Sequence, residues 1–386
     1  MRKRILISTL IEYLTILLIT AAIFMPIYYS ETMIGKGIHD FADHLSWAKS
    51  FLNAPQDVPK DILNHAAWQW AVVAARLTLG GSWNTDALAV TLGSTLLSVG
   101  ILFWLFRKKL SPFLSGVFAL SLVLAAPIAL LYPFDRALYF GYIGNAIYHN
   151  PTIILLKPFA LLQFVFSVQA LQGKNAGWKA ILITALVSSI AVFAKPNYVI
   201  CLLPSLGIFT LWRILKKEPL DWKRIIFGIV LPSIAILIWQ FTSNYGVAEE
   251  GGVIFAPFAA MYTLSYKYLL IKFILSIIFT LVVTLVYWKE SIKDIRIQFG
   301  WIGFGFGATF TYFFAESGQR FNHGNFTWSG IITLFILFVC CALFLSEKGF
   351  PSKNRLANWL IISAGTLHVV FGVIYYLVVL FTSIFY

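Results

Sequence analysis

Charged residues are scarce in this chain: Asp, Glu, Lys and Arg make up only 12% of its 386 residues, whereas 59% are hydrophobic. Soluble globular domains carry about 25% charged residues. The shortage of charge excludes a water-soluble fold, and the long apolar runs are typical of helices that cross a bilayer. We therefore predict an all-α polytopic membrane protein.

Cysteine is also rare, and its three copies, Cys201, Cys340 and Cys341, lie inside apolar runs. This placement excludes a disulfide framework and a thiolate metal site. The sequence lacks a glycine-rich phosphate loop followed by Lys and Ser or Thr, which argues against a nucleotide site of that kind. It shows no internal repeat and no low-complexity segment, and we expect a single transmembrane domain over residues 1–386.

Apolar segments of about 20 residues, the length that crosses a bilayer as a helix, predict about eleven transmembrane helices. The first follows Met1-Arg2-Lys3-Arg4 and is too long for the apolar part of a signal peptide, so we expect a retained span. The predicted spans are 5–29, 86–106, 112–132, 152–170, 178–194, 197–212, 225–242, 268–287, 298–314, 327–345 and 357–383.

The formal net charge of +13 is distributed along the chain as a membrane topology requires. Nineteen of the 29 Lys and Arg residues fall in one set of alternate loops, with five acids, whereas the other set holds ten residues of each sign. Because basic loops face the cytoplasm, we expect a cytoplasmic N-terminus in an inner or plasma membrane. Nucleic acid is not needed as a partner. Five of the six histidines then face outward, where we expect any chemistry.

The first outward loop, residues 30–85, is too long for a simple connection. Residues 40–52 carry apolar side chains at helical spacing, which predicts a short helix along the membrane interface. Residues 62–79 form a second apolar stretch, which polar residues interrupt and Gly80-Gly81 end. We predict an interfacial or partly inserted helix there, because a full span would turn every later basic loop outward.

Two carboxylates and an imidazole lie close together in the first of these helices. Asp40 and Asp43 are three residues apart and share one helical face, with His44 beside Asp40. Such a group can act as a general base whose pKa a neighbouring carboxylate tunes. Asp40, Asp43 and His65 can also supply ligands for a divalent metal such as Mg or Mn. The structural alternative is that Asp40 caps the helix and Asp43 occupies its first turn.

Further polar groups gather at the outward ends of the spans. Lys157 and Lys195 lie near helix ends, where a cation either binds a lipid phosphate or extends to the interface. The loop histidines and acids are either ligands or hydrogen-bonding and solvated groups. The candidate substrate-binding residues are His44, His65, His149, Lys157, Lys195, Glu249, Glu250, Glu316, Arg320 and His323.

A first span is followed by Asp40-Phe-Ala-Asp-His-Leu-Ser-Trp-Ala48, then by Asn64-His65-Ala-Ala-Trp-Gln-Trp and Leu79-Gly80-Gly81-Ser82. A span that ends in Arg107-Lys108-Lys109 comes next. This order resembles the GT-C superfamily of integral-membrane glycosyltransferases, and Ala194-Lys195-Pro196-Asn197 is similar to segments of its bacterial members.

The resemblance implies transfer of a sugar from a polyprenyl-phosphate-linked donor to an extracytoplasmic acceptor, namely an envelope glycan, a glycolipid or a protein. In that family the acid of the first loop is the usual catalytic residue, which corresponds to Asp40 here, with Asp43 as the second choice. An acceptor hydroxyl would attack the anomeric carbon with inversion, while some of Lys157, Lys195 and Arg320 hold the phosphate. The expected setting is polysaccharide biosynthesis in the cell envelope.

Three other functions remain open. A polysaccharide polymerase or ligase would use a diphosphate-linked oligosaccharide donor. A lipid or sugar transporter would place its ionisable residues at broken helices near the midplane, whereas here they cluster at the outward ends. A non-catalytic envelope-assembly protein would tolerate replacement of the outward polar residues.

Overall fold

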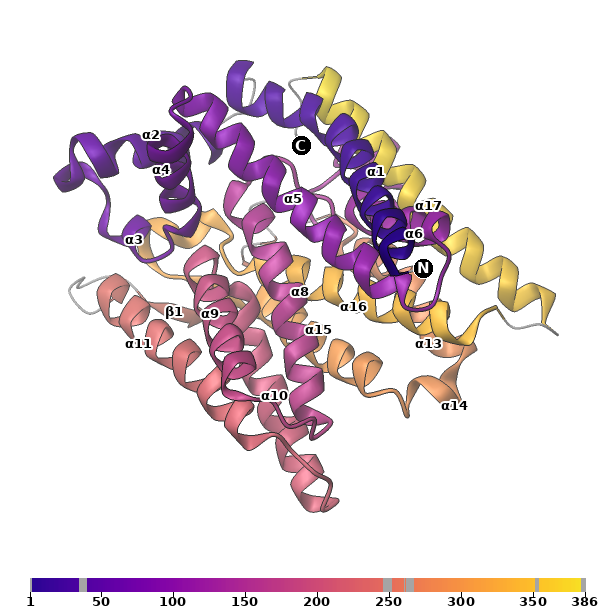
Figure 1. Cartoon of the computed structure of the whole chain (residues 1–386). Coiled ribbons are helices and arrows are strands. Elements are labelled where there is room, and N and C mark those ends of the chain that lie inside the picture. Colours follow the sequence, from indigo (N-terminus) through magenta and orange to yellow (C-terminus); the bar gives the residue numbers. More distant parts are fainter. Residues whose placement is uncertain are drawn as a thin grey trace.

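The apolar runs of the sequence fold into long helices that pack side by side, as Figure 1 shows. This computed structural model describes residues 2–34, 40–245, 252–259, 261, 267–350 and 354–382. Within these ranges eight helices are long and apolar enough to cross a membrane. The chain is therefore an all-α membrane protein, as predicted.

Six of the eight candidate spans are single α-helices. A seventh is an α-helix that continues into a π-helical turn, and the eighth is a π-helix joined to an α-helix. They are α1 (Arg2–Tyr29), which continues into the π-helical turn η1 (Ser30–Ile34), α5 (Trp83–Arg107), α8 (Pro151–Leu171), α10 (Asn197–Leu215), η3 (Arg224–Val230) joined to α11 (Leu231–Tyr245), α13 (Leu269–Val286), α16 (Thr327–Lys348) and α17 (Arg355–Phe381).

The other three predicted spans coincide with helices that do not meet the same length and hydropathy. The helices α6 (Pro112–Leu124) and α9 (Trp178–Ala194) are apolar but shorter. The helix α15 (Ile295–Phe313) is long, but four glycines between residues 300 and 307 lower its hydropathy.

The predicted span 112–132 is wrong in its second half, because α6 ends at Leu124. The chain then runs without helical structure toward the short α7 (Tyr132–Asp135). The backbone N–H of Ala126 donates to the carbonyl of His368 on α17 over 3.0 Å, and Nδ1 of His368 donates to the carbonyl of Ala126 over 2.7 Å. Neighbouring helices thus supply hydrogen bonds that non-helical backbone inside a membrane requires.

The helix α16 forms the centre of the bundle, since 94% of its apolar 18-residue stretch is buried inside the protein. Its neighbours include α15, α10, α13 and α8. The approach of α15 depends on Gly307, where a Cβ atom would lie 2.7 Å from the carbonyl oxygen of Ser329. Close backbone contact at a small residue is the usual way in which helices associate in lipid.

In the described part of the chain, four short helices lie between η1 and α5: α2 (Asp40–Asn53), η2 (Pro55–Asp57), α3 (Lys60–Leu63) and α4 (Ala67–Leu79). The prediction of a helix over residues 40–52 is confirmed, and Phe41, His44, Leu45, Ala48 and Phe51 form its buried face. Gly80, with φ +66°, ends α4 as expected.

The predicted helix over residues 62–79 is confirmed from Ala67 to Leu79 but not before it, because the chain breaks between α3 and α4. Asn64 lies at the break and bonds to α11 instead of continuing the helix. Its Nδ2 donates to Oδ1 of Asn244 over 2.6 Å, and its carbonyl accepts a hydrogen bond from Nε2 of Gln240. Tertiary hydrogen bonds therefore replace the helical ones at this point.

The remaining elements connect the long helices. β1 (Val253–Phe255) pairs antiparallel with β2 (Phe314–Glu316), so that Val253 lies opposite Glu316. The short helix α14 (Trp288–Ser291) precedes α15, and the 3₁₀ helix η4 (Gly318–His323) follows β2.

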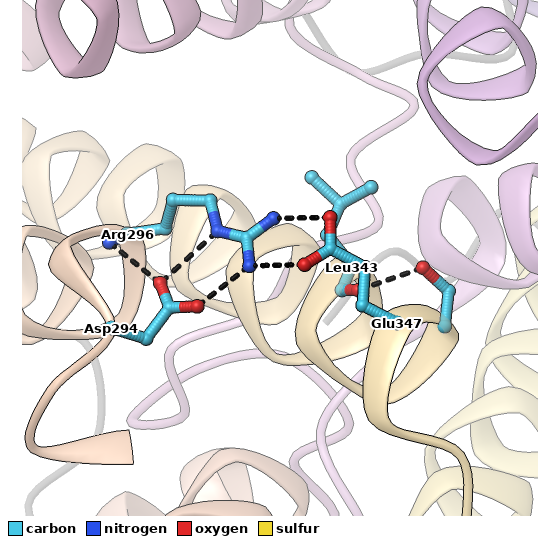
Figure 2. Close-up of polar contacts among 5 residues, drawn as sticks. Asp294, Arg296, Leu343 and Glu347 are labelled. Carbon is cyan, nitrogen blue, oxygen red and sulfur yellow. Dashed lines mark hydrogen bonds and ion pairs between the residues drawn. The ribbon is translucent and has the colours of Figure 1, made fainter. Parts of the chain in front are cut away.

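The basic loops lie together at one end of the bundle. Arg296, at the start of α15, binds Asp294 and donates two hydrogen bonds of 2.9 and 2.8 Å to Glu347 at the end of α16 (Figure 2). Lys109 lies close enough to Glu347, and Lys174 to Lys108, for their charges to interact. The loops that follow α5, α8 and α16 therefore share the end opposite the polar groups described next.

Candidate functional site

The start of α2 meets the start of α8. Asp40 is the first residue of α2, and its Oδ2 accepts a hydrogen bond of 2.6 Å from Nδ2 of Asn150. Asn150 in turn caps α8, because its Oδ1 accepts from the backbone N–H of Ile153 over 3.0 Å. Helix N-termini carry partial positive charge and favour a nearby anion. The contact therefore holds the Asp40 carboxylate where its negative charge is stabilised.

A chain of donors links this carboxylate to an ammonium. Nζ of Lys195 donates to Oγ1 of Thr152 over 3.1 Å, and the Thr152 hydroxyl donates to Oδ1 of Asn150 over 2.7 Å. Nδ2 of Asn150 then donates to Asp40. Every hydrogen bond points from the cation to the acid, an arrangement in which each bond strengthens the next. Asp40 is thus held by a directional network.

Lys195 is buried between aromatic and acidic groups at the end of α9. Its Nζ lies 4.8 Å from the centroid of the Trp328 ring, and the residue is 9% exposed. Burial lowers the pKa of Lys195 to about 8, although the carboxylates of Asp40 and Glu316 act in the opposite direction. The ammonium therefore titrates close to neutral pH instead of near its usual 10.5.

His149 lies between two aromatic rings, with its ring centroid 5.4 Å from Tyr139 and 5.8 Å from Trp328. Burial lowers the pKa of His149; the nearby Asp40 carboxylate partly offsets this effect, and Lys195 adds to it. The imidazole is therefore neutral at pH 7 and can form hydrogen bonds without adding charge.

His44 and His65 come from α2 and from the break before α4. Nδ1 of His44 lies 2.7 Å from Nε2 of Gln69, and because an amide nitrogen only donates, Nδ1 accepts and Nε2 carries the proton. Burial holds the pKa of His44 well below 6.5, and Lys195 and His65 lower it further. Burial, with Lys195 and Arg320, lowers the pKa of His65 to about 3. Both imidazoles are neutral at pH 7.

Glu316 and Arg320 add an acid and a cation from β2 and η4, between α15 and α16. Nη1 of Arg320 lies 3.8 Å from Oε1 of Glu316, and Nδ2 of Asn325 donates to Oε2 of Glu316. Asn197, at the start of α10, donates to the carbonyl of Asn325 over 2.8 Å. The loop is therefore tied to the helix that follows Lys195.

These residues form one group, which we name the polar cluster. Its members are Asp40, His44, His65, His149, Asn150, Thr152, Lys195, Glu316 and Arg320. The structure thus brings together residues that the sequence places between positions 40 and 320. Seven of the nine were candidates from the sequence.

Other candidates lie elsewhere. Asp43 and His323 are exposed. Lys157 is buried in a different environment, where its Nζ donates to the carbonyl of Asn145 over 2.7 Å and lies 5.2 Å from the centroid of the Phe335 ring. Glu249 and Glu250 lie outside the described residues.

The proposed divalent metal finds no ligand set in the described part of the chain, where no three His, Cys, Asp or Glu side chains gather closely enough to hold an ion. Asp40, Asp43 and His65 in particular do not form such a group. Asp43 is exposed, whereas the side chain of His44 is buried.

Sequence reasoning missed the neutral members of the cluster and two buried acids. Asn150 and Thr152 flank Pro151 and resemble an ordinary helix start, so only their contacts reveal them. Glu31 is buried within η1 and close enough to Asp40 for their charges to interact. A carboxylate at the end of an apolar run was the signal that could have identified it.

Asp135 is the second buried acid, and its partner lies on α13. Oδ2 of Asp135 is 2.5 Å from Nζ of Lys272, with both side chains at most 3% exposed. Lys272 also donates to the carbonyl of Phe140 over 3.0 Å. This ion pair fixes the irregular segment that leads to His149, because a buried charge without its partner is strongly unfavourable.

The cluster has the chemistry of a site that moves a proton and binds an anion. It combines two carboxylates, a buried ammonium, a guanidinium and three neutral imidazoles, and one oxygen of the Asp40 carboxylate is held by Asn150. Such a set can accept a proton from a hydroxyl and hold a phosphate or carboxylate. Comparison with known proteins adds no assignment: the chain matches no protein-family model, and no curated protein sequence is significantly similar to it.

Proposed function

We propose that this chain is a membrane glycosyltransferase that moves a sugar from a polyprenyl-phosphate donor to an extracytoplasmic envelope glycan, glycolipid or protein. The observation that carries the proposal is the hydrogen bond between Asp40 and Asn150, which holds the first-loop acid in one network with Lys195. The resemblance to the GT-C superfamily expects an acid at this position, next to cations that bind phosphate.

The proposal includes eleven spans, with the N-terminus in the cytoplasm and the polar cluster outside an inner or plasma membrane. Its support is the direction of the shorter helices. The helix α9 runs from the loop of Lys174 to Lys195, and α15 runs from Arg296 to the strand of Glu316. Each therefore joins the basic end of the bundle to the cluster, as a span would.

In the proposed reaction Asp40 takes the proton from an acceptor hydroxyl as its oxygen attacks the anomeric carbon of the sugar. The new bond forms while the bond between that carbon and the phosphate oxygen breaks, and the phosphate leaves with the electron pair. Lys195 and Arg320 stabilise the departing charge. A single displacement inverts the anomeric carbon. Asn150 occupies Oδ2 of Asp40, which directs Oδ1 to the proton.

The experiment supplies purified protein with a panel of radiolabelled polyprenyl-monophosphate sugars and a total lipid and glycan extract. It compares the native chain with Asp40→Asn, which preserves size but removes the base. We expect the variant to transfer label about 10²- to 10⁴-fold more slowly, the usual contribution of a general base. Asp57→Asn is the matched control, because Asp57 is an exposed acid of the same loop.

Each outcome separates the candidate functions. Equal transfer by the native chain and Asp40→Asn would reject Asp40 as the base, and a parallel Asp43→Asn variant would then test the second acid. If the native chain consumes only diphosphate-linked oligosaccharides, the function is that of a polymerase or ligase. No consumption of either donor would favour transport or assembly.

A further inference from the structure

A groove of about 560 Å³ lies between α1, α5 and α6, at the opposite end of the bundle from the polar cluster. Its walls are mostly apolar and include Ile11, Ile16, Phe103, Phe113, Val117 and Leu120. Ser8, Glu12 and Thr15 add polar atoms along α1. The helices α1 and α6 contact each other (Figure 1), and both contribute residues to the groove lining.

The length of the groove matches one leaflet of a bilayer. Its lining on α1 extends from Ser8 to Ile19, which corresponds to about 17 Å along a helix at 1.5 Å per residue. The hydrocarbon core of a bilayer is about 30 Å thick. The groove therefore covers about half of the core, the depth that one acyl chain occupies.

Positive charge surrounds the end of the groove that lies at the basic surface. Arg107 is bound to Glu12 in the groove wall, with Nε 2.9 Å from Oε2. Lys108 and Lys109 are exposed and lie in the short connection before Pro112, the first residue of α6 in the lining. The helix α1 also begins with Arg2-Lys3-Arg4. Arg107, Lys108 and Lys109 therefore outnumber Glu12 at this end, and Glu347 lies close enough to Lys109 for their charges to interact.

We propose that the groove binds one acyl chain of an anionic phospholipid, with the lipid phosphate held by Lys108 and Lys109. Basic pockets between helices on the cytoplasmic side are the known chemistry for anionic headgroups. Glu12 already pairs with Arg107, so the charge for the phosphate comes from Lys108, which lies over the Trp104 ring, and from Lys109, which also interacts with Glu347. The acyl chain of a neutral lipid would fit the same apolar groove, but its headgroup would not gain the attraction of the two lysines.

This site is independent of the proposed glycosyltransferase reaction, because its lining and its basic residues lie at the other end from Asp40. The polyprenyl-phosphate donor is assigned to Lys195 and Arg320 and has no role in the groove. The inferred ligand is therefore a component of the surrounding leaflet.

The test measures lipid retention by native mass spectrometry of the full chain. The protein is released from detergent in the presence of phosphatidylglycerol, phosphatidylcholine or polyprenyl phosphate, each at the same concentration. We expect phosphatidylglycerol to be retained most strongly. The double variant Lys108→Gln/Lys109→Gln should reduce its affinity by about fivefold for each lysine removed. Lys216→Gln/Lys217→Gln, an exposed basic pair that follows α10, a helix with no residue in the groove lining, should leave it unchanged.

A second variant tests the apolar walls. Gly116→Leu fills the groove, because a Cβ atom at Gly116 would already lie 3.1 Å from the flexible end of Ile16. We expect it to weaken retention of both phospholipids while the melting temperature stays within a few degrees. Equal retention of the two phospholipids by the native chain, or stronger retention of polyprenyl phosphate, would overturn the proposal. Unchanged phosphatidylglycerol retention in the double lysine variant would overturn it as well.

Discussion

At the scale of single residues, Asn150 has two separable roles. Its amide nitrogen donates to Asp40, and its amide oxygen caps α8. Asn150→Asp retains the capping oxygen, because aspartate is as good an N-cap as asparagine. It replaces the donor with a second carboxylate, whose negative charge repels that of Asp40. The change therefore removes the positioning contact and leaves the helix start intact.

We expect Asn150→Asp to shift the acid limb of the pH profile of kcat/KM to higher pH by about one unit. The measurement is sugar transfer over pH 5 to 9 with the polyprenyl-monophosphate donor. Asn354→Asp is the control, since Asn354 caps α17 in the same way, through a bond of 3.0 Å from Ala357. An unchanged profile, with transfer lowered equally at every pH, would mean that Asn150 is only a helix cap.

Lys195 gives a prediction at high pH. Because burial lowers its pKa to about 8, the ammonium is present below pH 8 and loses its proton as the pH rises through that value. The proposed ionic interaction between Lys195 and the donor phosphate should weaken over the same pH range. Lys195→Arg keeps the positive charge at pH 9, since guanidinium is not deprotonated in proteins.

The measurement is kcat/KM for the donor between pH 6.5 and 9.5. We expect the native chain to lose at least tenfold above pH 8, whereas Lys195→Arg stays level and Lys195→Gln is low throughout. Parallel curves for the native chain and Lys195→Arg would show that another group causes the decline.

The ionisable members of the site could be found from the sequence because such residues are rare in a mostly hydrophobic chain. Asp40, His44 and Lys195 are polar in a chain that is 59% hydrophobic, and such residues are expensive near a membrane unless they have a function. Asn150 carries no such signal, because an amide before Pro151 is what any helix start contains. Its role depends on a contact across 110 positions of sequence, which no local pattern encodes.

At the scale of elements, the end of α6 shows where hydropathy fails. Residues 125–131 are as apolar as the helix before them, so a span prediction continues through them. Pro127 cannot continue the helix, and the freed backbone groups find partners on other elements: Ala126 bonds to His368 on α17, and Ile128 donates to the carbonyl of Leu275 on α13 over 3.3 Å. The sequence predicted most helices correctly because their hydrogen bonds are internal, and it failed where the bonds cross between elements.

This break depends on Gly372 of α17, where a Cβ atom would lie 1.9 Å from the carbonyl oxygen of Leu124. Backbone atoms cannot move aside as a side chain can. We expect Gly372→Ala to cost about 1–3 kcal/mol, the usual range for overpacking, measured as a lower melting temperature in detergent. Gly365→Ala on the same helix is the control, because its Cβ would meet only Phe279 at 3.6 Å. Equal melting temperatures would mean that α17 moves freely past α6.

At the scale of the whole molecule, the two ends of the bundle differ in charge and in the function that we propose for each. The basic end carries the network of Arg296 and Glu347 and the proposed lipid groove, and the other end carries the polar cluster. The segregation was predicted from the loop charges alone, because a bilayer sorts basic loops to one side. The packing of α16 in the centre was not, because an evenly apolar helix gives no sign of which face is buried.

The number of spans can be decided by chemical access to three exposed positions. Asp57 lies in the first outward loop, Lys109 before α6 and Lys174 after α8. The native cysteines Cys201, Cys340 and Cys341 are fully buried, so the variants Asp57→Cys, Lys109→Cys and Lys174→Cys each add one reactive thiol. In sealed right-side-out vesicles we expect an impermeant maleimide to label only Asp57→Cys, and detergent to expose the other two.

The pair Lys109→Cys and Lys174→Cys is the decisive comparison, because only α6, the irregular segment after it and α8 lie between them. Two crossings return the chain to the same side, as the eleven-span topology requires. If α6 and the segment after it do not cross, α8 is the only crossing, and the two thiols react from opposite sides. The broken element whose hydrogen bonds are supplied by His368 and Leu275 therefore determines on which side every later loop lies, including the loop that carries Glu316 and Arg320.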